Sequence, residues 1–166
     1  MIIFDFDLTL VNTQPTEKLR SERKWKDVMA QAGKLEVYSG ITELLKELAA
    51  RNQTLAIVTN SPDMVPRYFI RKHEWPVDIV LGYHQISRKK PDPEGLFLAM
   101  KKAGANSDNT FHVGDQPEDT EASRAASVTS VGAGWGLADT RFLKTSAPDY
   151  FFASVAELRN FLLETV

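Results

Sequence analysis

The stretch IIFDFDLTL, residues 2–10, joins a short apolar run to two aspartates that stand two positions apart. An apolar run of this length that stops at a polar residue is typical of a buried strand in a parallel sheet. Similar runs recur at residues 55–59, 79–83, 111–115, 129–132 and 150–152. Longer amphipathic stretches separate them, and this alternation predicts an α/β fold: a doubly wound, Rossmann-like, mostly parallel sheet with helices on both faces.

Residues 13–38 interrupt the alternation between the first strand and the helix that precedes the second. We expect a reduced helical cap insertion here, little more than one long helix over residues 14–33, on a single domain that spans residues 1–166. The predicted helix carries the cations Lys18, Arg20, Arg23, Lys24 and Lys26. They form either a solvated basic face over an apolar underside or a lid whose charge attracts an anionic substrate.

Composition and charge narrow the class of protein. The net charge of −2 and the apolar fraction of 43% are ordinary for a globular domain and do not favour a protein whose main task is to hold nucleic acid. The absence of cysteine excludes disulfides and thiolate metal sites, which fits a reducing compartment. The first apolar run is too short for a signal-peptide core or a membrane span, so we expect a soluble cytoplasmic protein without membrane partners.

Polar residues follow four of the predicted strands. In a parallel sheet the carboxyl ends of the strands share one edge, so these residues should lie close together. They are Asp5 and Asp7 after the first strand, Thr59 and Asn60 after the second, Lys90 beyond the third and Asp115 after the fourth. Three carboxylates at one edge repel each other unless a cation neutralises them, and an all-oxygen ligand set favours Mg2+.

Four motifs in order resemble those of the haloacid dehalogenase superfamily of hydrolases. They are DFDLTLVNT at residues 5–13, IVTNSP at 57–62, KPDP at 90–93 and GDQPED at 114–119. Together they cover most of the chain, and they are most similar to the phosphoglycolate phosphatase and phosphoglucomutase-like branch, here with a truncated cap. Position 8 is leucine where many members have glycine, and position 12 is asparagine where aspartate is frequent.

The resemblance implies a role for each motif residue. Asp5 would be the nucleophile, transiently phosphorylated, and Asp7 the general acid and base. Mg2+ would be held by the carboxylates of Asp5 and Asp115 and the backbone carbonyl of Asp7. Thr59, Asn60 and Lys90 would bind the phosphate. Asp119 is either a support to this cluster or simply a cap of the helix that begins beside it.

The expected function is therefore magnesium-dependent hydrolysis of phosphomonoesters. A phosphomutase of the same fold and a non-catalytic binding or scaffold domain are the alternatives. The short cap favours a bulky phosphorylated substrate presented from outside, or a partner subunit that completes the lid. Nucleic acid is expected only as such a phosphorylated substrate, and the sequence does not define the oligomeric state.

Overall fold

The computed structural model describes all residues, 1–166, and contains one six-stranded sheet and one small two-stranded ribbon. Every neighbouring pair in the large sheet is parallel, in the order β5-β4-β1-β6-β7-β8. Its strands are β1 (Ile2–Phe4), β4 (Leu55–Val58), β5 (Ile79–Leu81), β6 (Phe111–Gly114), β7 (Thr129–Ala133) and β8 (Tyr150–Phe152). The predicted parallel α/β fold is confirmed, and each strand lies within two residues of its predicted bounds.

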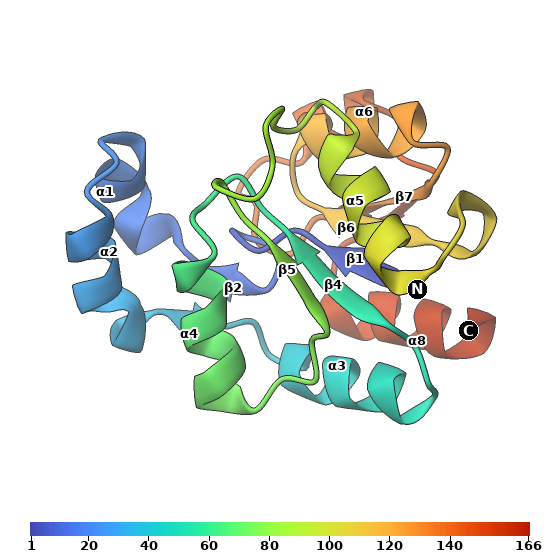
Figure 1. Ribbon diagram of the computed structural model, residues 1–166, viewed down its shortest axis with the longest axis horizontal. Helices are drawn as coiled ribbons and strands as arrows, with labels where there is room; N and C mark the ends of the chain where they lie inside the picture. Colours follow the sequence, from blue (N-terminus) through green and yellow to red (C-terminus); the bar gives the residue numbers. More distant parts are fainter.

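Helices cover both faces of the sheet, as Figure 1 shows. One face packs against α3 (Ile41–Ala50), α4 (Met64–His73) and α8 (Val155–Thr165), and the other against α5 (Glu94–Ala103) and α6 (Pro117–Ala125). A short helix, α7 (Arg141–Thr145), precedes the edge strand β8. No helix is both long and apolar enough to cross a membrane.

The first strand supplies side chains to both cores. Ile2 and Phe4 belong to the larger buried cluster under α3 and α8, whereas Ile3 belongs to the smaller cluster under α5 and α6. This alternation follows from the period of two along a strand. All three residues are apolar and almost fully buried, because β1 lies at the centre of the sheet. The aspartate that follows is thereby fixed at the middle of the carboxyl edge.

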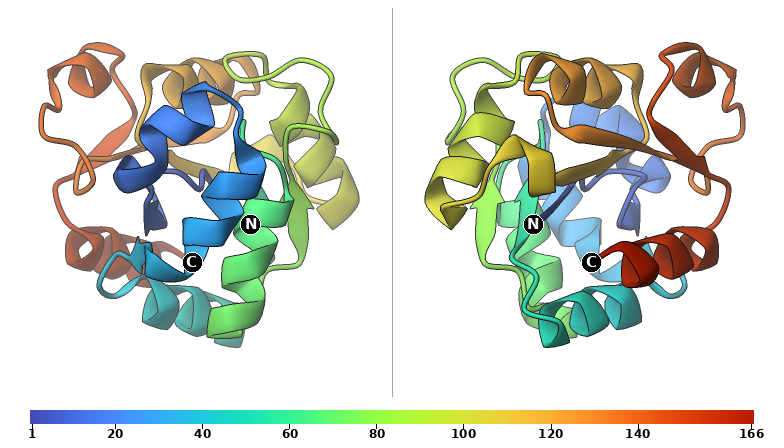
Figure 2. Two further views of the ribbon diagram at one scale, coloured as in Figure 1. Left: turned by 90° about the vertical axis from the view of Figure 1, so that its left-hand side faces the viewer. Right: turned by 90° about the vertical axis from the view of Figure 1, so that its right-hand side faces the viewer.

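The cap insertion differs from the single long helix that we predicted. It contains η1 (Gln14–Thr16), α1 (Glu17–Ser21), α2 (Trp25–Gln31) and η2 (Ala32–Lys34). The helical stretch breaks at Arg23, whose φ of 56° is left-handed and cannot continue a helix. The two short helices meet at an angle, and they lie beside α4 at the end of the sheet to which the strands point (Figure 1; Figure 2, left).

A ribbon of two short strands joins the two ends of the cap to the rest of the molecule. β2 (Val11–Asn12) pairs antiparallel with β3 (Glu36–Val37), with Val11 opposite Val37. The Tyr38 amide also donates to the carbonyl of Leu10 at 3.1 Å. The chain therefore leaves the sheet region and returns to it at one point.

Candidate active site

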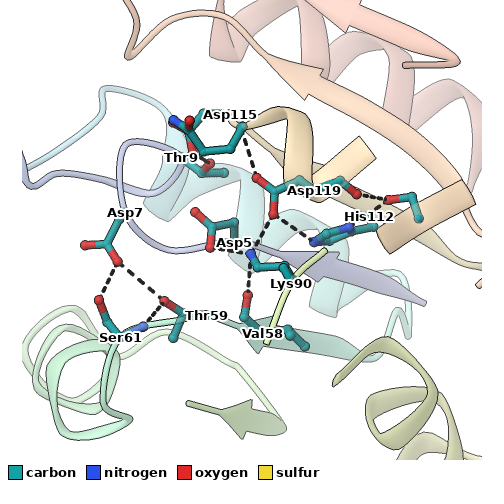
Figure 3. A network of polar contacts seen from close by, with 12 residues as sticks. Asp5, Asp7, Thr9, Val58, Thr59, Ser61, Lys90, His112, Asp115 and Asp119 are labelled. Carbon is teal, nitrogen blue, oxygen red and sulfur yellow. Dashed lines mark hydrogen bonds and ion pairs between the residues drawn. The ribbon is translucent and has the colours of Figure 1, made fainter. Parts of the chain in front are cut away.

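The predicted site residues gather at the carboxyl edge of the sheet. Asp5 follows β1 and Asp115 follows β6, and these strands are neighbours. Lys90 comes from the connection between β5 and α5 and reaches the same place. Figure 3 shows these side chains pointing toward one another, with Asp7 turned to one side. The edge therefore brings together residues that are far apart in the sequence.

Lys90 lies at the centre of the cluster. Its Nζ donates to Asp5 Oδ1 at 2.7 Å, to Asp119 Oδ1 at 2.6 Å and to the carbonyl of Val58 at 3.1 Å. Only 5% of the side chain is exposed. All three donor positions of the ammonium group are therefore occupied by this cluster.

The two cations before Lys90 point elsewhere. Arg88 forms ion pairs with Asp92 and Glu94, and the Lys89 ammonium lies 4.3 Å from the centre of the Tyr83 ring. Of the three consecutive cations, Lys90 is thus the one whose ammonium contacts Asp5.

Burial and repulsion shift the protonation of the carboxyl groups. Burial raises the pKa of Asp5 to about 7, and the charges of Asp119 and Asp7 add to the rise while Lys90 opposes it. Burial also raises the pKa of Asp115 well above its usual range, with further contributions from Asp5 and Asp119. For Lys90, burial alone would lower the pKa, but Asp119 and Asp5 outweigh it and the net shift is upward. The cluster thus has more negative charge than one lysine balances.

Asp119 has two roles at once. Its Oδ2 accepts from the Gln116 amide at 3.0 Å and caps α6, while its Oδ1 pairs with Lys90. Burial would raise its pKa, but the charge and hydrogen bond of Lys90 and the Gln116 amide reverse this, so the net shift is downward and Asp119 is ionised. Gly114 makes room for it, because a Cβ there would lie 2.3 Å from the Asp119 carboxyl group. Both interpretations of Asp119 describe part of its environment.

His112 lies behind Asp119 in the buried part of the network. Its Nε2 is 3.8 Å from Asp119 Oδ1, and its Nδ1 is 2.8 Å from the Ser123 hydroxyl. Burial lowers the pKa of His112 to about 4 against the opposing charge of Asp119, so the imidazole is neutral at pH 7. It therefore packs beside the Asp119 carboxylate without adding charge.

Asp7 faces away from Asp5 toward the second motif and the cap. Its Oδ2 accepts from the Ser61 hydroxyl at 2.7 Å and from the Thr59 hydroxyl at 3.4 Å. Its Oδ1 lies 3.1 Å from Nη1 of Arg20 in α1. Thr59 is fully buried, whereas Asn60 is exposed and lines the cavity above the site. The structure therefore places Thr59 against Asp7 and leaves Asn60 open to a ligand.

Three contacts at the site were not predicted. Ser61 holds Asp7, Thr9 Oγ1 donates to Asp115 Oδ1 at 3.3 Å, and Arg20 reaches Asp7 from the cap. The first two lie inside the motifs, where a hydroxyl next to a predicted site residue was the available signal. Arg20 could not be distinguished from the other cap cations, because the break at Arg23 changes which of them face the sheet.

A large cavity lies between the cap and the carboxyl edge. Its volume is about 970 Å3. Asp5, Asp7 and Lys90 line its floor, and Arg20, Arg23 and Trp25 line the wall that the cap provides. A space of this size can hold a small organic ligand with several polar groups.

The residues of the site fit a divalent cation. Asp5, Asp115 and Asp119 are buried, and each offers a carboxylate oxygen within 4.8 Å of the others. Oxygen ligands and surplus negative charge suit Mg2+. Lys90 pairs with both Asp5 and Asp119, but the pKa of Asp119 is lowered whereas the pKa values of Asp5 and Asp115 are raised, so Asp5 and Asp115 have the greater need of a cation.

The fold and the site define a doubly wound α/β domain with a buried carboxylate and lysine centre at the carboxyl edge of its sheet. The chain belongs to the haloacid dehalogenase-like hydrolase family, whose model matches residues 16–133. This confirms the resemblance that the four motifs predicted.

Known proteins similar to this chain support the same assignment. It is 30% identical over 139 residues to a phosphoglycolate phosphatase of Pseudomonas fluorescens, covering 78% of this chain and 48% of that protein. It is 27% identical over 128 residues to the pyrophosphatase PpaX of Oceanobacillus iheyensis, covering 71% and 56%. The chain thus spans about half the length of these curated relatives. A hydrolase from Pseudomonas syringae has the same fold, with a TM-score of 0.83, 21% identity and coverage of 98% and 97%.

Proposed function

We propose that this protein is a magnesium-dependent phosphomonoester hydrolase that works through an aspartyl-phosphate on Asp5. The observation that carries the proposal is the buried contact between Asp5 and Lys90 beneath a large cavity, with Asp115 beside it. The similar proteins named phosphoglycolate phosphatase and pyrophosphatase support it, because both names describe the hydrolysis of a phosphate group.

In this proposal Asp5 is the nucleophile. One of its carboxylate oxygens attacks the phosphorus, and the bond from phosphorus to the alcohol oxygen breaks. Lys90 reduces the repulsion between the anionic nucleophile and the anionic phosphate, because its ammonium already lies 2.7 Å from Asp5. When bound by Asp5, Asp115 and the backbone carbonyl of Asp7, Mg2+ would neutralise negative charge on phosphate oxygens.

In this proposal Asp7 carries out the proton transfers. It would give a proton to the departing alcohol and later take one from the water that hydrolyses the aspartyl-phosphate. The Ser61 and Thr59 hydroxyls hold its carboxyl group on the cavity side of the second motif. For contact with a leaving group, Asp7 has to turn from these partners toward Asp5, which requires the rotation of this one half-buried side chain. Thr59 would then be free to donate to the phosphate oxygens, as the exposed Asn60 already is.

The remaining expectations are kept as parts of this proposal. Residues 1–166 form one domain with residues 13–38 as its reduced cap, and the protein works in the cytoplasm on a phosphorylated substrate.

A phosphomutase would have to keep water from the aspartyl-phosphate. The cavity argues for hydrolysis, because its volume of about 970 Å3 leaves room for water beside a small substrate. A scaffold would not need the buried charges, which cost stability.

Phosphate release from a panel of phosphomonoesters with Mg2+ tests the proposal. Wild type should turn over, and Asp5→Asn or chelation of the metal should abolish release. Asp108→Asn, an exposed carboxylate in η3 (Ser107–Asn109), serves as the control and should behave like wild type. Acid-quenched wild type should also contain an acyl phosphate that hydroxylamine cleaves. Undiminished release by Asp5→Asn would rule out Asp5 as the nucleophile.

A further inference from the structure

The cap brings two arginines into the wall of the cavity. Arg20 in α1 and Arg23 in the break before α2 both line it. Arg20 is the more enclosed residue: 19% of its side chain is exposed and its Nη1 lies 3.1 Å from Asp7 Oδ1. Arg23 lies instead with its guanidinium 5.8 Å from the centre of the Tyr83 ring. Arg20 is therefore the cap cation that stands beside the reacting groups.

Arg20 is important for binding because the lysine of the cavity is already occupied by other groups. Lys90 is the third cation of the cavity wall, and Asp5, Asp119 and the Val58 carbonyl occupy its ammonium group. It can serve the phosphate that is transferred, but it lies too deep to serve the rest of a substrate. The cations left for the remainder of the molecule come from the cap.

The guanidinium of Arg20 is not saturated by the contact that it makes. Its Nε is buried and has no hydrogen-bond partner, and Asp7 Oδ1 likewise has no well-directed hydrogen bond. A guanidinium presents a planar fork of donors that suits the two oxygens of a carboxylate or a phosphate. A buried donor without a partner is unfavourable, so an anion that bound at this fork would gain more than one bound at a solvated lysine.

We propose that Arg20 is a specificity-determining residue that binds a second anionic group of the substrate. The inference rests on the proposed function and names its substrate class: phosphomonoesters whose alcohol carries a carboxylate or a second phosphate a few atoms from the ester oxygen. In the structure the Asp7 carboxylate occupies part of this anion site. Binding of such a substrate transfers Arg20 to the ligand and releases Asp7 for its contact with the leaving group.

Arg20 could instead act only as a latch between the cap and Asp7. The two roles predict different patterns. A latch would affect every substrate in the same proportion, because its work is done on the protein. A specificity residue affects substrates with a second anionic group much more than analogues that carry the phosphate ester alone. The comparison across substrates therefore separates them, and loss of overall activity does not.

The experiment compares three phosphate esters: 2-phosphoglycolate with its carboxylate, ethylene glycol bisphosphate with its second phosphate, and ethyl phosphate with neither. Wild type, Arg20→Gln, Arg20→Lys and Lys18→Gln are assayed with Mg2+. Lys18 is the matched control, an exposed cation on the same helix that does not line the cavity. The first two esters each carry a second anionic group, and the comparison between them shows whether a carboxylate or a phosphate is preferred.

Wild type should favour at least one of the two esters with a second anionic group over ethyl phosphate. Arg20→Gln should lower kcat/KM for that ester about tenfold to a hundredfold, the loss expected for a hydrogen-bonded charge pair, mostly through KM. Its effect on ethyl phosphate should be about tenfold smaller or less, because that ester has no second anionic group for Arg20 to bind. Arg20→Lys should restore part of the preference, and Lys18→Gln should match wild type. An equal decline for all three esters would overturn the proposal.

A binding measurement keeps this inference distinct from the proposed function. Calorimetric titration of Asp5→Asn with the three esters gives dissociation constants without turnover. A preference for an ester with a second anionic group, abolished by Arg20→Gln in this background, supports the inference even if wild type releases no phosphate. The absence of phosphate release would refute only the hydrolase proposal. Equal affinity for the esters with and without a second anionic group, both before and after Arg20→Gln, would overturn the inference.

Discussion

Replacement of Lys90 by methionine tests the buried charge cluster without any assay of activity. Methionine has a similar length and keeps the packing of the stem, but it removes the ammonium that contacts Asp5 and Asp119 at 2.7 and 2.6 Å. Both carboxylates are almost completely buried, so water cannot replace the lost partner. The change therefore leaves two carboxyl groups without their common counter-charge.

The expected loss of stability follows from this geometry. Removal of one partner of a buried ion pair typically costs about 3–5 kcal/mol. Part of this is recovered, because the pKa of Asp5 is already about 7 and rises further without Lys90, so Asp5 takes up a proton. We expect a loss of about 3 kcal/mol at pH 8 and less at pH 5.5. For a chain of this size, that corresponds to a fall in Tm of roughly 6–12 °C.

Urea unfolding of the metal-free protein at both pH values measures the effect. Lys102→Met, at an exposed lysine of α5, is the control and should stay within about 0.5 kcal/mol of wild type. The double variant Lys90→Met with Asp119→Asn should be more stable than the sum of the two single losses predicts, since it removes one of the stranded charges. A free energy of unfolding for Lys90→Met equal to that of wild type at pH 8 would refute the reasoning.

Three further predictions concern the same centre. Gly114→Ala should destabilise the protein by about 1–3 kcal/mol, because the new methyl group collides with the Asp119 carboxyl group, and thermal unfolding would show no change if that contact were absent. Asp119→Asn keeps the helix cap but loses the charged contact with Lys90. The free energy of unfolding should therefore fall by about 1–3 kcal/mol, and phosphate release should be slower. Unaltered stability and rate would contradict this. Without metal, Tm should fall from pH 6.5 to pH 8. The pKa of Asp5 is about 7 in the folded protein, whereas an unperturbed aspartate has a pKa of about 3.9, and the pKa of Asp115 is also raised. The folded state therefore holds protons that the unfolded state has lost. The lowered pKa of His112 works in the opposite direction only below pH 6.5, and Mg2+ should raise Tm more at pH 8 than at pH 6.5; a Tm that rises with pH in the metal-free protein would contradict the assignment.

The sheet and the residues along its edge could be predicted because their signals are local. Apolar runs that end at Asp5 and Asp115 define strand ends, and parallel pairing then brings those ends together. The choice of Lys90 over its two neighbours depended on the motif and not on charge. The position of each of these residues relative to a bound metal or phosphate stays a prediction.

The cap was predicted less well, because its conformation depends on contacts that periodicity does not contain. The helical pattern continues through Arg23, yet the backbone there is left-handed and two short helices result. The contact between Arg20 and Asp7 follows from that break and from the docking of α1 over the carboxyl edge. The two functions of Asp119 were also beyond the sequence, which showed an acidic first helical turn but not which side chain turned inward.

The ribbon of β2 and β3 has a consequence for how this protein can change. Because Val11 and Val37 are paired, the chain leaves the α/β body and returns to it at two adjacent strands. We expect that a cap segment of different length or composition can replace the one between β2 and β3 without altering the order of the six strands. The ribbon thus marks the boundary between the cap and the α/β body, and a transplanted segment should be joined there.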